Sequence, residues 1–130
     1  MKKYAILVIT LVCFMILLVG CGTQDFKFKL QNINTIILQD VTTGGSVTID
    51  DKDTISILIN NFNDLSVKKE ENKFISPAGN GYKITFKDVD GNIIKDIHVF
   101  GENLIYYSNY FYTVTKGTID LDLIRTHLEK

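Results

Sequence analysis

The chain has 130 residues, of which 45% are hydrophobic, and a formal net charge of −1. This length suits one domain, and two cysteines are too few for a disulfide-rich scaffold. The balance of 14 basic and 15 acidic residues leaves no basic footprint for nucleic acid, and one proline with nine glycines excludes a collagen-like chain.

The first twenty residues are far more apolar than the rest, since 16 of them are hydrophobic. Lys2 and Lys3 give a short basic start, and the apolar run from Tyr4 to Val19 is broken only by Thr10. A membrane-spanning helix usually needs about 20 apolar residues. A basic start followed by a shorter apolar run is typical of a secretory signal peptide. The alternative is an N-terminal transmembrane anchor that stays on the protein.

The end of this apolar run resembles a lipobox, the processing site of bacterial lipoproteins, in the segment Leu18-Val19-Gly20-Cys21. The resemblance implies cleavage between Gly20 and Cys21 and a diacylglyceryl group on the Cys21 thiol. Small Gly20 fits a signal-peptide cleavage site. Two acyl chains give stable membrane attachment, whereas one chain gives only marginal binding. We therefore expect a protein anchored by lipid to the extracytoplasmic face of the cell membrane.

The predicted organisation has three parts. A signal peptide covers residues 1–20, a lipidated N-terminus with a short tether covers 21–32, and a single domain covers 33–130. Loss of the two signal-peptide lysines changes the net charge from −1 to −3. Residues 26–30 alternate between apolar and polar types, which fits a strand as well as an extended arm lying on the domain.

The domain begins with a pattern typical of a β-hairpin. Residues 34–41 and 46–50 are strand-like, and glycines at 44 and 45 allow the turn between them. Residues 65–69 form a weaker strand candidate. The segment 76–81, which contains the only proline, is the strongest break in the chain.

Two segments have helical periodicity. Apolar residues recur at the spacing of one helix face at Ile55, Leu58, Ile59 and Phe62. They predict a helix over about 52–63 with Asp51 as its N-cap. A similar stripe is formed by Leu121, Ile124 and Leu128. It predicts a last helix over about 119–128, with Thr118 as its cap and Asp120 in its first turn.

Hairpins dominate the region between these helices. The predicted strands are residues 82–87, 93–100, 104–107 and 110–115. Asp88–Asn92 favours a primed hairpin turn, and Ser108–Asn109 forms a two-residue loop. We therefore expect an α+β fold, with an antiparallel, hairpin-rich sheet of about five to six strands and two helices packed on it.

Few residues offer catalytic or metal-binding chemistry. Asp96 and His98 lie two apart on a strand and share a face, but a metal site would also need Glu102 or His127. The chain has no nucleophile elbow, zinc-protease helix or phosphate-binding loop, and no cysteine thiol remains after lipidation. The sequence therefore predicts no catalytic residue, no metal and no cofactor.

The most distinctive surface is aromatic, because Tyr106, Tyr107, Tyr110, Phe111 and Tyr112 lie within seven residues. Alternation along a hairpin places some of these rings on each face of the sheet. They either pack across strands or form a recognition patch. The candidate partner-binding residues are Tyr106, Tyr107, Tyr110 and Tyr112.

The whole chain resembles the small, uncharacterised lipoproteins of low-GC Gram-positive bacteria. The similar segments are Met1-Lys2-Lys3, the Leu18–Cys21 box and the stretch from Tyr82 to Asn92. The resemblance implies lipidation of Cys21 and assigns no catalytic residue. We expect a membrane-anchored, non-enzymatic binding or interaction module whose partner is an envelope protein or a wall polymer. The alternatives are an envelope-associated enzyme or accessory subunit, and an immunity or exclusion lipoprotein.

Overall fold

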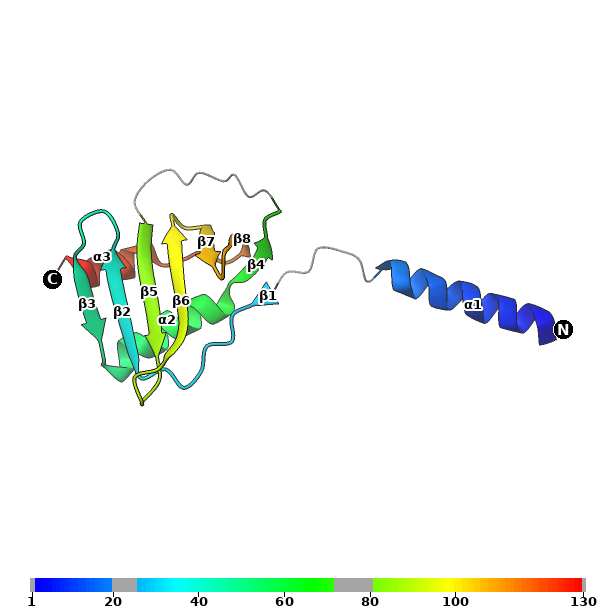
Figure 1. The fold of residues 1–130 in the computed structure, drawn as a ribbon, viewed down its shortest axis with the longest axis horizontal. Helices are drawn as coiled ribbons and strands as arrows, with labels where there is room; N and C mark the ends of the chain where they lie inside the picture. The colour runs from blue at the N-terminus through cyan, green and yellow to red at the C-terminus, as the bar shows by residue number, and fades with distance from the viewer. Residues whose placement is uncertain (1, 20–25, 72–80, 130) are drawn as a thin grey trace.

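Antiparallel strands supply more of the domain's regular structure than helices do, as the succession of predicted hairpins indicates. The computed structural model describes residues 2–19, 26–71 and 81–129 (Figure 1). The strands are β1 (Phe26–Lys27), β2 (Thr35–Asp40), β3 (Ser46–Ile49), β4 (Ser66–Lys69), β5 (Gly81–Lys87), β6 (Ile93–Phe100), β7 (Leu104–Tyr107) and β8 (Tyr110–Lys116). The helices are α1 (Lys2–Val19), α2 (Lys52–Asp64) and α3 (Leu121–Leu128).

All eight strands join one antiparallel sheet in the order β1-β4-β8-β7-β6-β5-β2-β3. The predicted α+β class is therefore confirmed, and the expected count of five to six strands is too low. The additional strands are β1 and β4, two short segments that pair with each other at one end of the sheet. The sequence offers both only as weaker candidates, at 26–30 as a strand or an extended arm and at 65–69, because their pairing partners are distant in the sequence.

Helix α1 covers the segment that the sequence predicts as the apolar part of a signal peptide. It is a third helix, beyond the two expected in the domain. No helix among the described residues is long and apolar enough to cross a membrane. The predicted cleavage and lipidation site at Gly20 and Cys21 lies outside the described residues.

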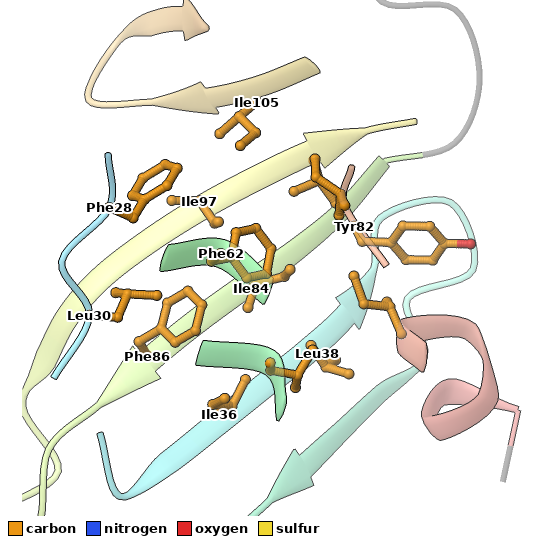
Figure 2. Close-up of a cluster of buried hydrophobic side chains, with 14 of the residues drawn as sticks. Phe28, Leu30, Ile36, Leu38, Phe62, Tyr82, Ile84, Phe86, Ile97 and Ile105 are labelled. Carbon is orange, nitrogen blue, oxygen red and sulfur yellow. The ribbon is translucent and has the colours of Figure 1, made fainter. Parts of the chain in front are cut away.

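The core lies between one face of the sheet and helices α2 and α3 (Figure 2). The strands β2, β5 and β6 contribute the fully buried residues Ile36, Leu38, Ile84, Phe86, Ile97 and Val99. From its predicted stripe, α2 buries Ile55, Leu58 and Phe62. The rings of Phe62 and Phe86 meet edge-on, with their centroids 5.8 Å apart. From α3, Ile124 is completely buried against the same core.

Helix α2 begins where the sequence predicts. The Asp51 carboxylate accepts a hydrogen bond of 2.9 Å from the backbone N–H of Thr54, so Asp51 is confirmed as the N-cap. This bond holds the pKa of Asp51 below its ordinary value, because it stabilises the ionised carboxylate. The helix ends at Asp64, one residue beyond the expected end.

Helix α3 begins later than the sequence predicts, at Leu121 rather than residue 119. Its N-cap is Asp120, whose carboxylate accepts a hydrogen bond from the Leu123 N–H, so the prediction of Thr118 as the cap is wrong. The Asn61 side chain explains the difference. Its amide donates to the Thr118 carbonyl and its oxygen accepts from the Asp120 N–H, both at 2.9 Å, and these bonds hold residues 118–120 outside the helix.

The two central hairpin turns differ in type. Ser108 and Asn109 both have positive φ, 51° and 69°, as a two-residue primed turn requires. The prediction of a primed turn at Asp88–Asn92 is wrong, because within this loop only Gly91 has positive φ. The N–H of Gly91 donates to the Asp88 carbonyl at 3.1 Å, which is the arrangement of a type I turn followed by a glycine bulge.

The N-terminal arm is part of the domain. Phe28 is 2% exposed and Leu30 is 5% exposed, and both belong to the core (Figure 2). The Asn63 side chain bonds both backbone groups of Leu30, accepting from its N–H at 2.8 Å and donating to its carbonyl at 3.0 Å. The tether predicted over 21–32 is therefore too long, since the chain enters the fold at Phe26.

Candidate binding surface on the open face of the sheet

Helices α2 and α3 both pack on one face of the sheet, because their buried residues belong to the same core cluster. The opposite face, here called the open face, is covered by no helix in the part of the chain that the structure describes. Antiparallel sheets commonly keep one solvated face, and its residues are then mostly polar. The open face of this sheet departs from that pattern at its centre.

Four aromatic side chains form a patch on the open face: His98, Phe100, Tyr106 and Phe111. The Tyr106 and Phe111 rings are closest, with centroids 4.9 Å apart. His98 lies 6.3 Å from Tyr106 and 6.4 Å from Phe100, and Phe100 lies 6.2 Å from Phe111. Each of the four is half-buried, so the rings pack against one another and keep part of their surface in solvent. We call this set the open-face patch.

The strand register assembles the patch. His98 of β6 is the partner of Tyr106 of β7, which is in turn the partner of Phe111 of β8. The two-residue turn at Ser108–Asn109 fixes this register by placing Tyr107 directly opposite Tyr110. A one-residue shift of β8 against β7 would turn Phe111 to the other face and break up the patch.

Gly81 leaves room for the Phe100 ring to lie against the sheet. It is the partner of Phe100 in the β5–β6 ladder, and a Cβ at Gly81 would lie 2.7 Å from Cε1 of the Phe100 ring. A side chain at this position would therefore push the ring outward. The bare backbone of Gly81 is what brings Phe100 against β5.

Polar groups border the patch on both sides. On the β5 side, Lys83 and Asp96 form an ion pair at 3.4 Å, and the Thr85 hydroxyl donates to Asp96 at 3.1 Å. On the β4 side, the Thr113 hydroxyl donates to Glu70 at 2.6 Å. An aromatic centre within a polar border is typical of surfaces that bind a partner.

The structure divides the four candidate tyrosines between the two faces. Tyr106 belongs to the open-face patch, whereas Tyr107 and Tyr112 lie on the helix side with their rings 6.3 Å apart. Tyr107 also meets Phe28 edge-on at 6.3 Å, so these two tyrosines extend the core. Tyr110 is 39% exposed and lies under the amine of Lys69, 3.4 Å from its ring centroid. The four tyrosines therefore do not form one surface.

On the face that carries the helices, packing shifts the pKa values of two side chains, Tyr112 and Lys95. Burial, with a smaller effect of the neighbouring tyrosines, raises the pKa of Tyr112. Partial burial lowers the pKa of Lys95, whose amine lies 5.0 Å from the Phe28 ring centroid and 4.9 Å from that of Tyr107. Such cation–π contacts offset part of the cost of removing the ammonium group from water.

The residues considered for a metal site are not brought together. Asp96 and His98 share the open face, but Asp96 is paired with Lys83 and His98 lies against aromatic rings. His127 is on α3, where its Nδ1 lies 2.9 Å from the Leu123 carbonyl. Among the described residues, no group of three or more His, Cys, Asp or Glu side chains could hold a metal ion.

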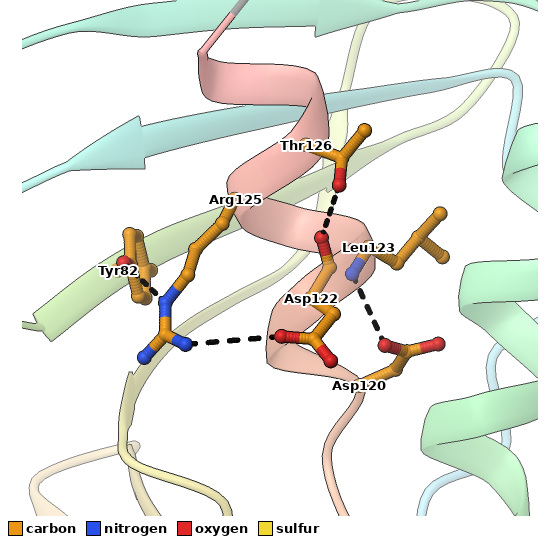
Figure 3. A network of polar contacts seen from close by, with 6 residues as sticks. All are labelled: Tyr82, Asp120, Asp122, Leu123, Arg125 and Thr126. Carbon is orange, nitrogen blue, oxygen red and sulfur yellow. Dashed lines mark hydrogen bonds and ion pairs between the residues drawn. The ribbon is translucent and has the colours of Figure 1, made fainter.

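A pocket lies between α3 and the end of β2. It has a volume of about 250 Å³ and is lined by residues that include Asp40, Tyr82 and Arg125. The Arg125 Nε donates to the Tyr82 hydroxyl at 3.2 Å, and its Nη1 lies 3.9 Å from Asp122 (Figure 3). The bond to Tyr82 raises the pKa of Arg125 further. Because Tyr82 and Asp122 already engage the Arg125 guanidinium, this group is not free to bind a ligand in the pocket. The bond from Arg125 to Tyr82 instead fixes α3 to the sheet.

Sequence reasoning placed Tyr106 among the binding candidates and missed Phe100 and His98 as its neighbours. Alternation along residues 93–100 already puts His98 and Phe100 on one face. The missing step was the pairing of β6 with β7, which joins that face to the tyrosine hairpin.

Comparison of the chain with protein-family models, with curated proteins and with solved structures finds no match. The function is therefore argued from the geometry of the described residues.

Proposed function

We propose that this protein is a lipid-anchored, extracytoplasmic binding module that presents the open-face patch to a partner in the cell envelope. The observation that carries the proposal is the set of four aromatic side chains on a sheet face that no helix of residues 2–19, 26–71 and 81–129 covers. Aromatic residues are enriched at protein interfaces, because they offer large apolar area with a polar edge. An envelope protein or a wall polymer would stack on these rings and bond to the polar groups around them.

The anchor in this proposal is supported by the sequence. Lys2 and Lys3, the apolar run that follows and the Leu18–Cys21 segment stand in the order of a lipoprotein signal. A diacylglyceryl group on Cys21 would hold the domain at the outer face of the cell membrane. The partner would therefore be another component of the envelope.

A binding role fits the side chains of the open face better than a catalytic one. Acid–base catalysis needs a titratable group within hydrogen-bond reach of a reacting atom and often a second group to orient it. Asp96 is held by Lys83 and Thr85, and His98 has rings as its neighbours. This arrangement supports recognition without chemistry.

Removing two rings of the patch tests the binding surface. The double substitution Tyr106→Thr and Phe111→Thr keeps β-branched residues on the strands and is expected to reduce partner capture at least about tenfold, as loss of central aromatic contacts does. The measurement is the yield of the crosslinked complex from intact cells. Tyr110→Thr is the matched control, because Tyr110 belongs to the same hairpin and projects from the other face. Undiminished capture by the double variant would contradict the proposal, and an equal loss in the control would show that the effect is not specific to the open face.

Substitution of the predicted lipidation site tests the anchor. Cys21→Ala should abolish incorporation of a labelled fatty acid, because no other thiol occupies the lipobox. It should also leave a precursor that retains residues 1–20 and is correspondingly heavier by mass spectrometry. Cys13→Ala is the matched control and should be labelled normally. Continued labelling of the Cys21→Ala protein would disprove the anchor.

A further inference from the structure

Five lysines lie at the end of the sheet formed by β1, β4 and β8: Lys27, Lys29, Lys68, Lys69 and Lys116. Lys27 is the partner of Ser66 in β4, and Ser66 is the partner of Lys116 in β8. The backbones of Lys27 and Lys116 are therefore only two strand spacings apart, about 10 Å. Lys68 lies diagonally opposite Lys27, two residues beyond Ser66. We call this set the basic edge.

The basic edge is available for contact. Four of its lysines are exposed, and Lys68 is half-buried. Neither ion pair found among the described residues, Lys83–Asp96 or Arg125–Asp122, uses any of them. Within the described parts of these segments the carboxylates are Asp64, Glu70 and Glu71, and Glu70 is engaged by the Thr113 hydroxyl. Counted over the described residues of these segments, five lysines stand against three carboxylates, so their balance is positive.

The opposite end of the domain is acidic. Helix α3 packs against β2 and β3 there, and the N-terminus of α2 follows β3 directly (Figure 1). The carboxylates at this end are Asp40, Asp50, Asp51, Asp53 and Glu129. The basic residues on the segments that carry these carboxylates are Lys52 and Arg125. A domain with an acidic total charge thus has one basic end and one strongly acidic end.

The chain enters the fold at the basic edge. Phe26 is the first residue of β1 and lies opposite Val67. The proposed lipid anchor on Cys21 is five residues earlier, which is at most about 18 Å of extended chain. Because Lys27 follows Phe26 directly, the basic edge is the part of the domain that this short connection holds nearest to the lipid headgroups.

We infer that the basic edge lies on the anionic headgroups of the membrane that holds the anchor, with the acidic end pointing away from it. This inference rests on the lipid anchor proposed above. An anionic surface attracts each nearby lysine, and the attraction acts over a Debye length of about 8 Å at physiological ionic strength. Repulsion of the acidic end favours the same orientation. In this orientation the strand edge of the sheet contacts the membrane, and the plane of the sheet is roughly perpendicular to the membrane surface. The open-face patch then faces neither toward nor away from the membrane and is accessible to other components of the envelope.

Tyr110 gives this edge an aromatic contact as well. Its ring is 39% exposed and lies beneath the Lys69 amine. Tyrosines are enriched where one end of the side chain is apolar and the other is wet, as at a membrane surface. The pair would place a ring and a cation at the depth of the headgroups.

Lysine acetylation rates test the orientation. The mature lipidated protein is reconstituted in vesicles of phosphatidylcholine alone, or of equal parts phosphatidylcholine and phosphatidylglycerol, and each lysine is followed by mass spectrometry. On the anionic vesicles, Lys27 and Lys116 should react about fivefold more slowly than on neutral ones, which corresponds to about 1 kcal/mol per lysine. Lys52 and Lys87 should react equally on both, and high salt should remove the difference.

A pair of matched variants completes the test. Lys27→Gln with Lys116→Gln should reduce the protection of Lys68 and Lys69 on anionic vesicles, whereas Lys52→Gln with Lys87→Gln should leave it unchanged. Equal rates at the basic edge on both vesicles, or protection at Lys52, would overturn the inference. Retention of the protein on neutral vesicles reports on the lipid anchor separately, so failure of the anchor and failure of the orientation are distinguishable.

Discussion

Replacing Phe62 with alanine is expected to lower the free energy of unfolding by about 3–5 kcal/mol, as loss of a buried phenylalanine does. The side chain is completely buried in α2. Its ring meets Phe86 of the sheet at 5.8 Å and Phe28 of the arm at 6.2 Å, so one substitution removes contacts to two elements. Urea denaturation followed by circular dichroism measures the change.

The control for this prediction is Ile57→Ala in the same helix. Ile57 is 53% exposed and should change the free energy of unfolding by less than about 1 kcal/mol. Small domains are typically stable by about 5–15 kcal/mol, so the Phe62 variant should lose a large share of its stability. Equal midpoints for the two variants would show that α2 does not pack on the sheet through Phe62.

Replacing Phe28 with alanine is expected to cost about 3–4 kcal/mol, although the residue precedes the first long strand. Phe28 is 2% exposed and contacts Phe62 and Tyr107 with its ring. If residues 21–32 were only a tether, the substitution would have no effect on stability. The measurement is again the urea midpoint, compared with that of the unsubstituted domain.

Lys29→Ala is the matched control for the arm, because Lys29 is the next residue and its side chain is exposed. It should leave the midpoint nearly unchanged. Asn63→Ala should lower the free energy of unfolding by about 1–2 kcal/mol, which is between the effects of Lys29→Ala and Phe28→Ala. The reason is that it removes both side-chain hydrogen bonds to the Leu30 backbone. An unchanged midpoint for Phe28→Ala would mean that the arm contributes nothing to the fold.

The sequence predicts the elements that depend on neighbouring residues. The strands around Ser108–Asn109 and the helix over α2 follow from alternation, turn residues and a stripe of apolar side chains, all within a few positions. The start of α3 does not follow in this way. Asn61, nearly sixty residues earlier, binds the segment before Asp120, and no local pattern contains that contact.

The candidate site likewise depends partly on local pattern and partly on long-range contacts. The tyrosine hairpin was evident as a cluster, but the cluster alone does not say which ring belongs to which face. The pairing of Tyr107 with Tyr110 sends Tyr106 and Phe111 to one side and Tyr112 to the other. His98 and Phe100 join Tyr106 only because β6 pairs with β7.

The sequence by itself determined the α+β class and the hairpin order, and it predicts the signal peptide and the lipid anchor. These depend on composition and short-range periodicity, which are properties of consecutive residues. Tertiary structure alone decided that Phe28 is core, that the open face holds an aromatic patch, and that the lysines gather where the chain enters the fold. The physical reason is that alternation gives a strand two faces, whereas the long-range packing of α2, α3 and the arm decides which face is buried.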